Sequence, residues 1–162
     1  MPPGGALPRT RPESGVMSEA VLIVCPHCHT TNRVRQDDLG KGPECGNCHQ
    51  ALFSGHPAPL DEAAFDRHVA RNQIPVLVDF WAPWCGPCRQ MAPAFEQAAA
   101  QLEPQVRLAK VNTDEAQTLG ARLNIRSIPT LALFVNGREV ARQPGAMGAA
   151  DIVRWARSQL RQ

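Results

Sequence analysis

The chain has 162 residues, enough for one ordinary domain and a second, smaller unit. Its apolar content of 43%, charged content of 20% and net charge of +2 are typical of a globular protein. Neither sign of charge forms a long block, and the longest apolar runs, near Val76–Trp81 and Leu131–Val135, are too short to cross a bilayer. We therefore expect no nucleic-acid partner and no membrane partner.

The first twenty residues differ in composition from the rest of the chain. They are rich in proline and glycine and carry Arg9 and Arg11, but they lack the continuous apolar stretch of a secretory signal. We expect residues 1–20 to be a disordered extension, with Met17 as an alternative start. Without an export signal we expect a cytoplasmic protein. Thiols stay reduced there, so six cysteines indicate metal binding or catalysis rather than structural disulfides.

Four of the cysteines form two C-x-x-C pairs, Cys25/Cys28 and Cys45/Cys48, with sixteen residues between the pairs. This spacing is typical of a structural zinc site, in which two tight turns each supply two thiolates to a tetrahedron. The segment 21–55 contains few large apolar side chains, so a bound metal would have to hold it together. The sequence therefore predicts a zinc-binding module over residues 21–55, with one Zn²⁺ per chain.

Other interpretations of this segment are weaker. The four cysteines could be free or form disulfides, and His27, His29 and His49 could be alternate ligands, although four cysteines already fill a closed site. A zinc module can also bind nucleic acid, but acidic residues here offset the basic ones, so the positive footprint is missing. A structural or partner-contacting module is favoured.

The second unit is predicted to begin near residue 56. Residues 54–59 read as a linker or a short irregular strand, and the apolar spacing of Phe65 and Val69 predicts a helix over residues 61–70. A buried strand is expected over Val76–Phe80. Asp79 lies within this apolar run, where a carboxylate is costly unless it is functional or paired. A purely structural, satisfied aspartate is the alternative.

The third C-x-x-C pair, Cys85 and Cys88, lies between that strand and a predicted helix that runs to about Leu102. Pro87 suits the first turn of a helix, where its missing N–H costs nothing. Unpaired N–H groups at a helix start stabilise a thiolate and lower the pKa of the cysteine there. The pair is therefore predicted to cycle between dithiol and disulfide, and a second metal turn is the alternative. Pro93 should kink the helix.

The rest of the chain alternates strands and helices. The predicted elements are strand 106–111, helix 115–123, loop 125–129, strand 130–135, strand 139–142 and a last helix over 149–159. Asn136-Gly137 between two strand-like runs is a strong hairpin signal. This order predicts an α/β fold, with a mixed central sheet that has helices on both faces.

With these elements and motifs, the chain resembles the thioredoxin family. Val76–Cys88 resembles the active-site strand and turn, Ile128-Pro129-Thr130 the cis-proline loop, and Asn136-Gly137 followed by Gly145 the C-terminal hairpin. The resemblance covers roughly residues 60–162 and implies a thioredoxin fold, so the thioredoxin domain is predicted over residues 56–162. Together with the two N-terminal cysteine pairs, it extends to the zinc-containing bacterial members of the family.

The resemblance implies a role for each of several residues. Cys85 would be the attacking thiol and Cys88 the resolving one. Asp79 would take the proton of Cys88 through a water, with Lys110 as the lysine that pairs with this acid. Family members that act as reductases carry Gly and Pro between the cysteines, as Gly86 and Pro87 do here. Pro129 would follow a cis bond, and the client surface would comprise Trp84, Ile128, Thr130, Gly145 and Ala146, with Trp81 either there or in the core.

The implied function is that of a monomeric protein-disulfide reductase. It would be re-reduced by an NADPH-dependent thioredoxin reductase and would act on protein disulfides. No G-x-G-x-x-G follows a strand, so we expect no bound organic cofactor. The zinc site is predicted to be structural or redox-sensitive. An oxidase or isomerase is disfavoured by the Gly-Pro pair. A zinc-ribbon adaptor with an inert second domain is disfavoured because Cys85 and Cys88 are both present.

Overall fold

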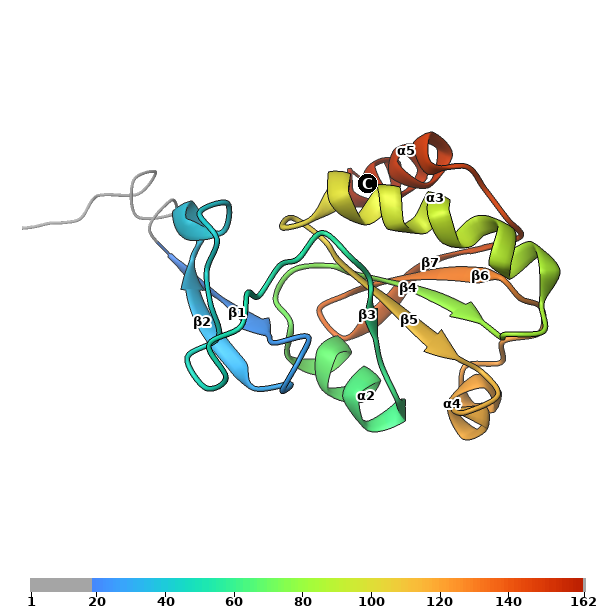
Figure 1. Cartoon of the computed structure of the whole chain (residues 1–162), viewed down its shortest axis with the longest axis horizontal. Coiled ribbons are helices and arrows are strands. Elements are labelled where there is room, and N and C mark those ends of the chain that lie inside the picture. Colours follow the sequence, from blue (N-terminus) through green and yellow to red (C-terminus); the bar gives the residue numbers. More distant parts are fainter. Residues whose placement is uncertain (1–18, 162) are drawn as a thin grey trace, which may run out of the picture.

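The computed structural model describes residues 19–161. Figure 1 shows a small N-terminal unit beside a larger unit built around a twisted sheet. The expected extension over residues 1–20, including Met17, lies almost entirely outside the described residues.

The N-terminal unit, called the ribbon below, is built on two short antiparallel strands. They are β1 (Ala20–Val24) and β2 (Thr31–Arg35), and a 3₁₀ turn, η1 (Gln36–Asp38), follows β2. The rest of the ribbon is loop, closed by a single bridge between Glu44 and Ala51. The first cysteine pair lies between the two strands and the second lies in the loop.

The larger unit has a five-stranded sheet in the order β3-β5-β4-β6-β7. The strands are β3 (Ala58–Pro59), β4 (Val76–Trp81), β5 (Arg107–Asn112), β6 (Thr130–Val135) and β7 (Arg138–Pro144). The first three run parallel to one another, and β6 and β7 are antiparallel to their neighbours. The predicted mixed sheet is therefore present, and the short strand expected in residues 54–59 is β3.

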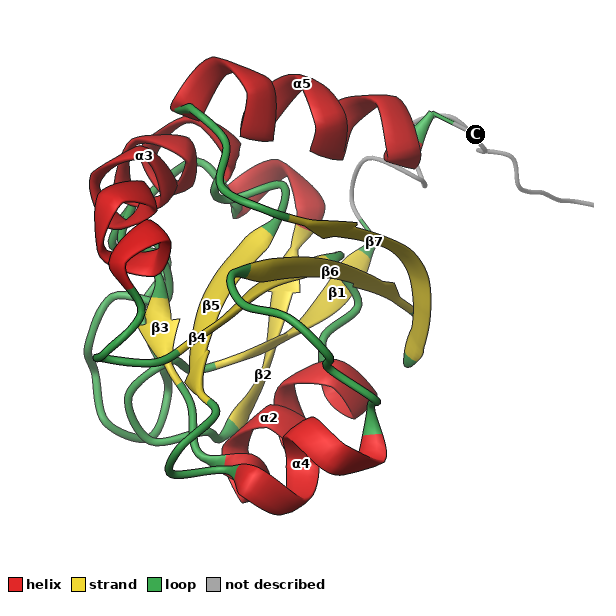
Figure 2. Cartoon of the chain, turned by 90° about the vertical axis from the view of Figure 1, so that its right-hand side faces the viewer, coloured by secondary structure: helices red, strands yellow, loops and turns green. Residues whose placement is uncertain are grey.

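Helices cover both faces of this sheet. Figures 1 and 2 show α3 (Gly86–Leu102) and α5 (Ala149–Leu160) on one face, and α2 (Glu62–Arg71) and α4 (Gln117–Arg122) on the other. Helix α2 begins where predicted because the Asp61 carboxylate caps it, accepting a bond from the Ala64 N–H at 2.8 Å. The assigned helix α3 continues through Pro93.

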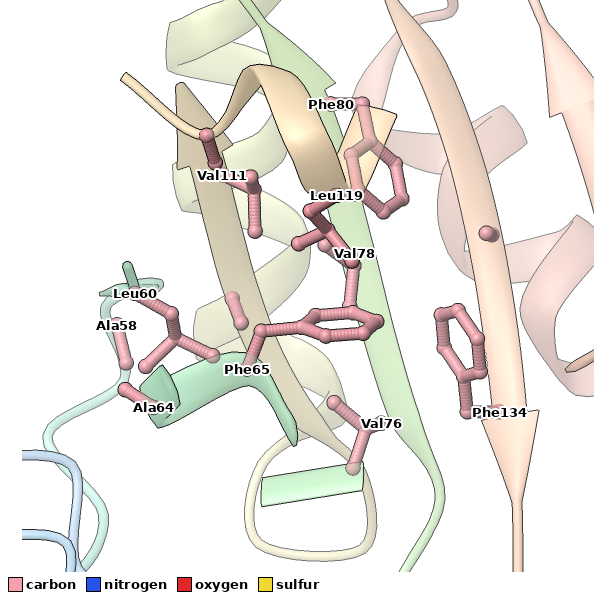
Figure 3. Packing of buried hydrophobic residues seen from close by; sticks show 13 residues of the cluster. Ala58, Leu60, Ala64, Phe65, Val76, Val78, Phe80, Val111, Leu119 and Phe134 are labelled. Atoms are coloured by element: carbon pink, nitrogen blue, oxygen red, sulfur yellow. The ribbon is translucent and has the colours of Figure 1, made fainter. Parts of the chain in front are cut away.

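Alternation along β4 divides the core into two layers. Val76, Val78 and Phe80 point to the α2 side, where Phe65 packs edge-to-face on Phe134 with ring centroids 5.4 Å apart. Figure 3 shows Phe65 reaching from α2 toward β6 in this cluster. The other side chains of β4, including Asp79, point to the α3 side. A buried carboxylate thus lies beneath the helix that begins at the third cysteine pair.

Helix α4 is shorter than predicted. It begins at Gln117 rather than residue 115, because the Asn112 side chain accepts the Asp114 N–H at 2.9 Å and holds a turn there. Ala116, with φ −122° and ψ 56°, is not helical. Asn136 and Gly137 both adopt positive φ, as the predicted hairpin turn requires.

The two edges of the sheet are protected differently. Strand β3 is only two residues long, whereas β7 is an exposed strand that carries Arg138, Glu139 and Arg142. On β7, Arg142 Nε donates to Glu139 Oε2 at 2.6 Å.

The core of the ribbon is completed by the larger unit. One cluster of buried side chains in the ribbon comprises Ile23, Cys25, Val34, Cys45 and Leu52, and Ile74, which precedes β4, packs among them. The few apolar side chains noted in the sequence therefore form a core only with help from outside the ribbon.

Among the described residues, no helix is long and apolar enough to cross a bilayer.

Candidate active site and metal centre

Cys85 and Cys88 form a disulfide at the start of α3. Cys85 is the N-cap residue, and its sulfur accepts the Cys88 N–H at 3.2 Å, while Gly86 and Pro87 form the first turn between them. Only 4% of Cys85 and 3% of Cys88 are exposed. An N–H at the start of a seventeen-residue helix points at the first sulfur, which is the arrangement that stabilises a thiolate.

Asp79 lies on the sheet face below this turn and is 1% exposed. It is paired in register with Lys110 on the adjacent strand β5. Burial raises the pKa of the Asp79 carboxyl to about 7, and the positive charge of Lys110 opposes the shift. Among the described groups, Asp79 Oδ1 has no hydrogen-bond partner. The carboxyl is therefore poised to gain or lose a proton near neutral pH.

The loop before β6 faces the disulfide. The Ile128–Pro129 bond is cis, as predicted, and the Ile128 carbonyl oxygen lies 3.7 Å from the Cys85 sulfur. Thr130 is buried, with its hydroxyl bonded to the Ser127 carbonyl at 2.6 Å. The Pro129 carbonyl accepts the Gly145 N–H at 2.9 Å, which ties the two loops together. Gly145 has φ +95°, a conformation that side chains rarely adopt.

Trp84 stands beside the disulfide and is 68% exposed. Its indole N–H donates to the Asp114 carboxylate, 3.0 Å from Oδ2, so the ring is held although it is exposed. A groove of about 300 Å³ begins at this ring and continues past Ile125 and Ile128. Ala146, also predicted to contact clients, is exposed next to Gly145. A groove with apolar side chains in its wall thus lies beside the disulfide, and it shares Trp84 and Ile128 with the disulfide's surroundings.

The other four cysteines come together in the ribbon. Their sulfurs all lie within 4.8 Å of one another, and the Cys25–Cys48 and Cys28–Cys45 sulfur distances are both 3.6 Å. Four thiolates bound to one zinc ion at about 2.3 Å are separated by about 3.8 Å in a tetrahedron. The spacing therefore fits a single Zn²⁺ ion.

The two turns that carry these cysteines have the same backbone pattern. The Cys25 N–H bonds to the Thr30 carbonyl and the Cys45 N–H to the Gln50 carbonyl, at 2.9 and 2.8 Å. His29 and His49 occupy the same positive-φ position, at 64° and 66°. His49 and His27 are exposed, whereas His29 Nδ1 lies 3.2 Å from His68 Nε2.

Hydrogen bonds to the sulfurs favour thiolates, the form that binds a metal. The Asn47 N–H and the Asn32 amide point at the Cys45 sulfur, at 3.3 and 3.4 Å. Side-chain hydrogen bonds, first with Thr30 and then with Asn47, lower the pKa of Cys28 to about 5. At Cys48 the backbone hydrogen bond with Gln50 does not offset burial and the neighbouring thiols, which raise the pKa to about 12. Thiolates this close repel one another, so a divalent cation among them would relieve the repulsion. The donor set therefore also fits zinc.

Three features of these sites were missed by sequence reasoning. Asp114, which orients Trp84, lies in an ordinary polar turn, and nothing in its local pattern distinguishes it. Arg107 and His68 are buried between the ribbon and the sheet. Sequence reasoning places such side chains at the surface, because charged residues are seldom fully buried and histidine is often exposed. Only the packing of two units against each other explains them.

Two family models match the chain. The one described as Thioredoxin matches residues 56–158, and the one described as Thioredoxin 2, N-terminal, a zinc ribbon, matches residues 24–50. The first match contains the Cys85–Cys88 pair and the cis-proline loop. The second contains the four clustered cysteines.

Relatives and solved structures agree with these matches. Thioredoxin C-3 of Corynebacterium nephridii is 44% identical over 142 residues, which is 88% of this chain and 97% of that protein. Thioredoxin of Haemophilus influenzae is 41% identical, over 59% of this chain and 90% of that protein. The structure of chloroplastic thioredoxin z superimposes with a TM-score of 0.61 at 25% identity, covering 66% of this chain and 96% of that one. The first of these similarities extends through the ribbon.

Proposed function

The chain belongs to the thioredoxin family of thiol–disulfide oxidoreductases, and from this premise we propose that it is a cytoplasmic protein-disulfide reductase that works through Cys85 and Cys88. The observation that carries the proposal is the Cys85 sulfur at the start of α3, 3.2 Å from the Cys88 N and 3.7 Å from the Ile128 carbonyl oxygen. This arrangement supports a nucleophilic role for Cys85, a resolving role for Cys88 and client binding by the Ile128 backbone.

In the reduced protein, the Cys85 thiolate attacks one sulfur of a client disulfide. A bond forms between Cys85 and that sulfur, the client's own S–S bond breaks, and the other client sulfur leaves as a thiolate. The N–H of Cys88 and the dipole of α3 stabilise the attacking thiolate. The product of this step is a mixed disulfide between Cys85 and the client.

The second step releases the client. Asp79 accepts the proton of the Cys88 thiol, and the resulting thiolate attacks the Cys85 sulfur and displaces the second client thiolate. A carboxyl with a pKa of about 7 can take up this proton and return it to solvent near neutral pH. Lys110, in register with Asp79, tunes that pKa through its charge. The client gains two electrons and two protons, and Cys85 and Cys88 end as a disulfide.

We assign client binding to the surface around the sulfurs. The backbone at Ile128, between Ser127 and the cis bond to Pro129, would pair with an extended client segment, as a strand adds to a sheet. Trp84 and the groove beside it would take an apolar client side chain. Gly145 and Ala146, both exposed, would complete the surface. Thr130, which the resemblance also assigned to it, is buried and would instead hold the loop through its hydroxyl bond to the Ser127 carbonyl.

The protein would be re-reduced by an NADPH-dependent thioredoxin reductase. Each cycle consumes two electrons, so an external donor must attack the Cys85–Cys88 disulfide. A protein donor would reach the nearly buried sulfurs by docking on the same surface that binds clients. We propose that the protein functions as a monomer, so that this surface stays free for both partners.

The ribbon would hold one structural Zn²⁺ through Cys25, Cys28, Cys45 and Cys48. The ion would neutralise the clustered thiolates and fix the two turns relative to each other. Oxidation of these thiols would release the ion, so the site would also respond to oxidants. Their need to stay reduced agrees with the proposed cytoplasmic location.

The test uses a matched pair of variants in an insulin-reduction assay with NADPH and thioredoxin reductase. Cys85→Ser and Cys88→Ser should both abolish turnover. Only Cys88→Ser should retain a client as a mixed disulfide, visible as a mass increase that dithiothreitol reverses. Undiminished turnover in Cys85→Ser, or client capture by Cys85→Ser instead of Cys88→Ser, would contradict the proposal.

A further inference from the structure

Arg107, the first residue of β5, is buried between the ribbon and the sheet and is only 1% exposed. Its Nη2 donates to two carbonyl oxygens of the ribbon, that of Leu52 at 2.7 Å and that of Val24 at 3.1 Å. Its guanidinium also lies 4.6 Å from the centre of the Phe53 ring. A side chain that belongs to the larger unit therefore donates two of its hydrogen bonds to the ribbon, and among the described groups its buried Nε has no partner.

The two carbonyls accepting these bonds lie at the two ends of the cysteine cluster. Val24 immediately precedes Cys25, and Leu52 lies just beyond the turn that holds Cys48. A single guanidinium nitrogen is therefore hydrogen-bonded both to Val24, at the start of the first cysteine turn, and to Leu52, after the end of the second. The bonds thus fix the separation of the two turns, which is the quantity that a tetrahedral metal site requires.

The larger unit holds both Arg107 and Val24 from its own side. Arg107 Nη1 donates to Glu103 Oε2 at 3.3 Å, and the Glu103 carboxylate also accepts the N–H groups of Leu108 and Gly55. The N–H of Val24 donates to the Asn72 side chain at 2.8 Å. Both the N–H and the C=O of Val24 therefore form hydrogen bonds with the larger unit. The guanidinium is therefore anchored on a rigid frame.

We propose that Arg107 is a positioning residue for the metal centre, through which the sheet of the larger unit holds the two cysteine turns at metal-binding distance. The inference rests on the proposed binding of Zn²⁺ by the four cysteines. Arg107 touches no sulfur by hydrogen bond among the described contacts, and it acts through the carbonyls of Val24 and Leu52.

The coupling operates in both directions. If Arg107 stabilises the arrangement that binds Zn²⁺, bound Zn²⁺ must stabilise the environment of Arg107 by the same amount. Loss of the ion would loosen both turns and leave the guanidinium without its ribbon acceptors, a costly state for a buried charge. The effect would then reach Leu108, whose N–H shares Glu103 with Arg107.

The test measures transfer of Zn²⁺ from the full-length, zinc-loaded protein to a chromophoric chelator at neutral pH. Arg107→Met should release Zn²⁺ at least about tenfold faster than the wild type, since hydrogen bonds from a charged donor are lost. Arg154→Met is the matched control, because Arg154 is exposed on α5 and pairs with Asp151 on the same helix. Its release rate should equal that of the wild type.

Circular dichroism confirms that each variant is folded under the assay conditions. Equal release rates in folded Arg107→Met and wild type would overturn the inference and leave the zinc proposal standing. A wild-type protein that takes up no Zn²⁺ would overturn both.

If Arg107→Met does not fold, amide hydrogen exchange on the wild-type protein tests the coupling between Arg107 and the metal site. Removal of Zn²⁺ should speed exchange of the Arg107 and Leu108 amides at least about tenfold and leave the Ile152 amide in α5 unchanged. The Arg107 N–H bonds to the Pro75 carbonyl and the Ile152 N–H to the Gly148 carbonyl, so both amides begin protected. Unchanged exchange at Arg107 and Leu108 would overturn the inference.

Discussion

Asp79 lies directly opposite Lys110 on the neighbouring parallel strand, yet its carboxyl retains a proton far more readily than an ordinary aspartate. Burial dominates the balance and raises the pKa to about 7, while the charge of Lys110 reduces the shift without cancelling it. The amine instead lies over the Trp81 ring, 4.5 Å from its centre. A buried acid of this kind reduces the stability of the fold.

Replacement of Asp79 by alanine should stabilise the protein at pH 8 and leave its stability unchanged below pH 4. The folded pKa of about 7 exceeds the ordinary aspartate pKa of 3.8, so the folded chain binds more protons between these values. Stability of the wild type should therefore fall as pH rises from about 4 to 7, by up to about 4 kcal/mol, and then level off. Guanidinium unfolding at pH 4 and pH 8 measures the difference.

The control for that experiment is Asp66→Ala. Asp66 is an exposed carboxylate that pairs with Arg122 at 2.9 Å, and its loss should change stability by less than about 1 kcal/mol. It should not alter the slope between pH 4 and 7. A wild-type slope that survives in Asp79→Ala would show that another group is responsible.

Cys85 of the reduced protein should be alkylated by iodoacetamide at pH 7 at least about tenfold faster than an ordinary exposed thiol. The N–H of Cys88 and the dipole of α3 favour the thiolate, which is the reactive form. Mass spectrometry of quenched samples gives the rate for each cysteine, with glutathione as the reference. A rate equal to that of glutathione would remove the physical basis of the proposed attack.

Trp84→Ala should weaken client binding and leave the fold intact. The ring is 68% exposed, so its removal takes little apolar surface from the core and the melting temperature should change by less than about 2 °C. The KM for a protein client should rise several-fold, because the ring forms one end of the groove. Asp114→Asn should raise the KM less, because it only weakens the hydrogen bond that holds the Trp84 ring in place. An unchanged KM in both variants would place the client elsewhere.

Cys45→Ser should lower the zinc content from one ion per chain to a small fraction of that. Cys45 is fully buried and receives N–H bonds from Asn47 and Asn32, so a neutral hydroxyl cannot replace its thiolate. Elemental analysis measures the metal, and trypsin should cleave the ribbon faster at Arg33 or Arg35. Retention of one zinc per chain in this variant would exclude Cys45 as a ligand.

Local patterns in the sequence sufficed for much of the fold and for the cysteines of both sites. The resemblance to the thioredoxin family and the predicted fold are confirmed by the family matches and the solved structure. These predictions succeeded because C-x-x-C pairs and the Asn136-Gly137 turn depend on neighbouring residues, whereas the cis bond at Ile128-Pro129 was implied by the family resemblance. The roles assigned to individual residues stay predictions.

The junction between the two units was not predicted. Burial of Arg107 depends on carbonyls at Val24 and Leu52, which lie more than fifty residues away in the chain. His68 shows helical spacing like any surface residue of α2, but it is fully buried against His29. No local signal reports a contact that forms only when separate segments fold against each other.

The exposed strand β7 has a consequence for behaviour at high concentration. A long edge strand has backbone groups free on one side that can pair with other chains, which is a common route to aggregation. Here Arg138, Glu139 and Arg142 place charges along that edge, and at the opposite edge β3 is only two residues long. Growth of the sheet into fibres is therefore opposed at both ends, even though the proposed client binding would pair a strand of another protein with the loop at Ile128.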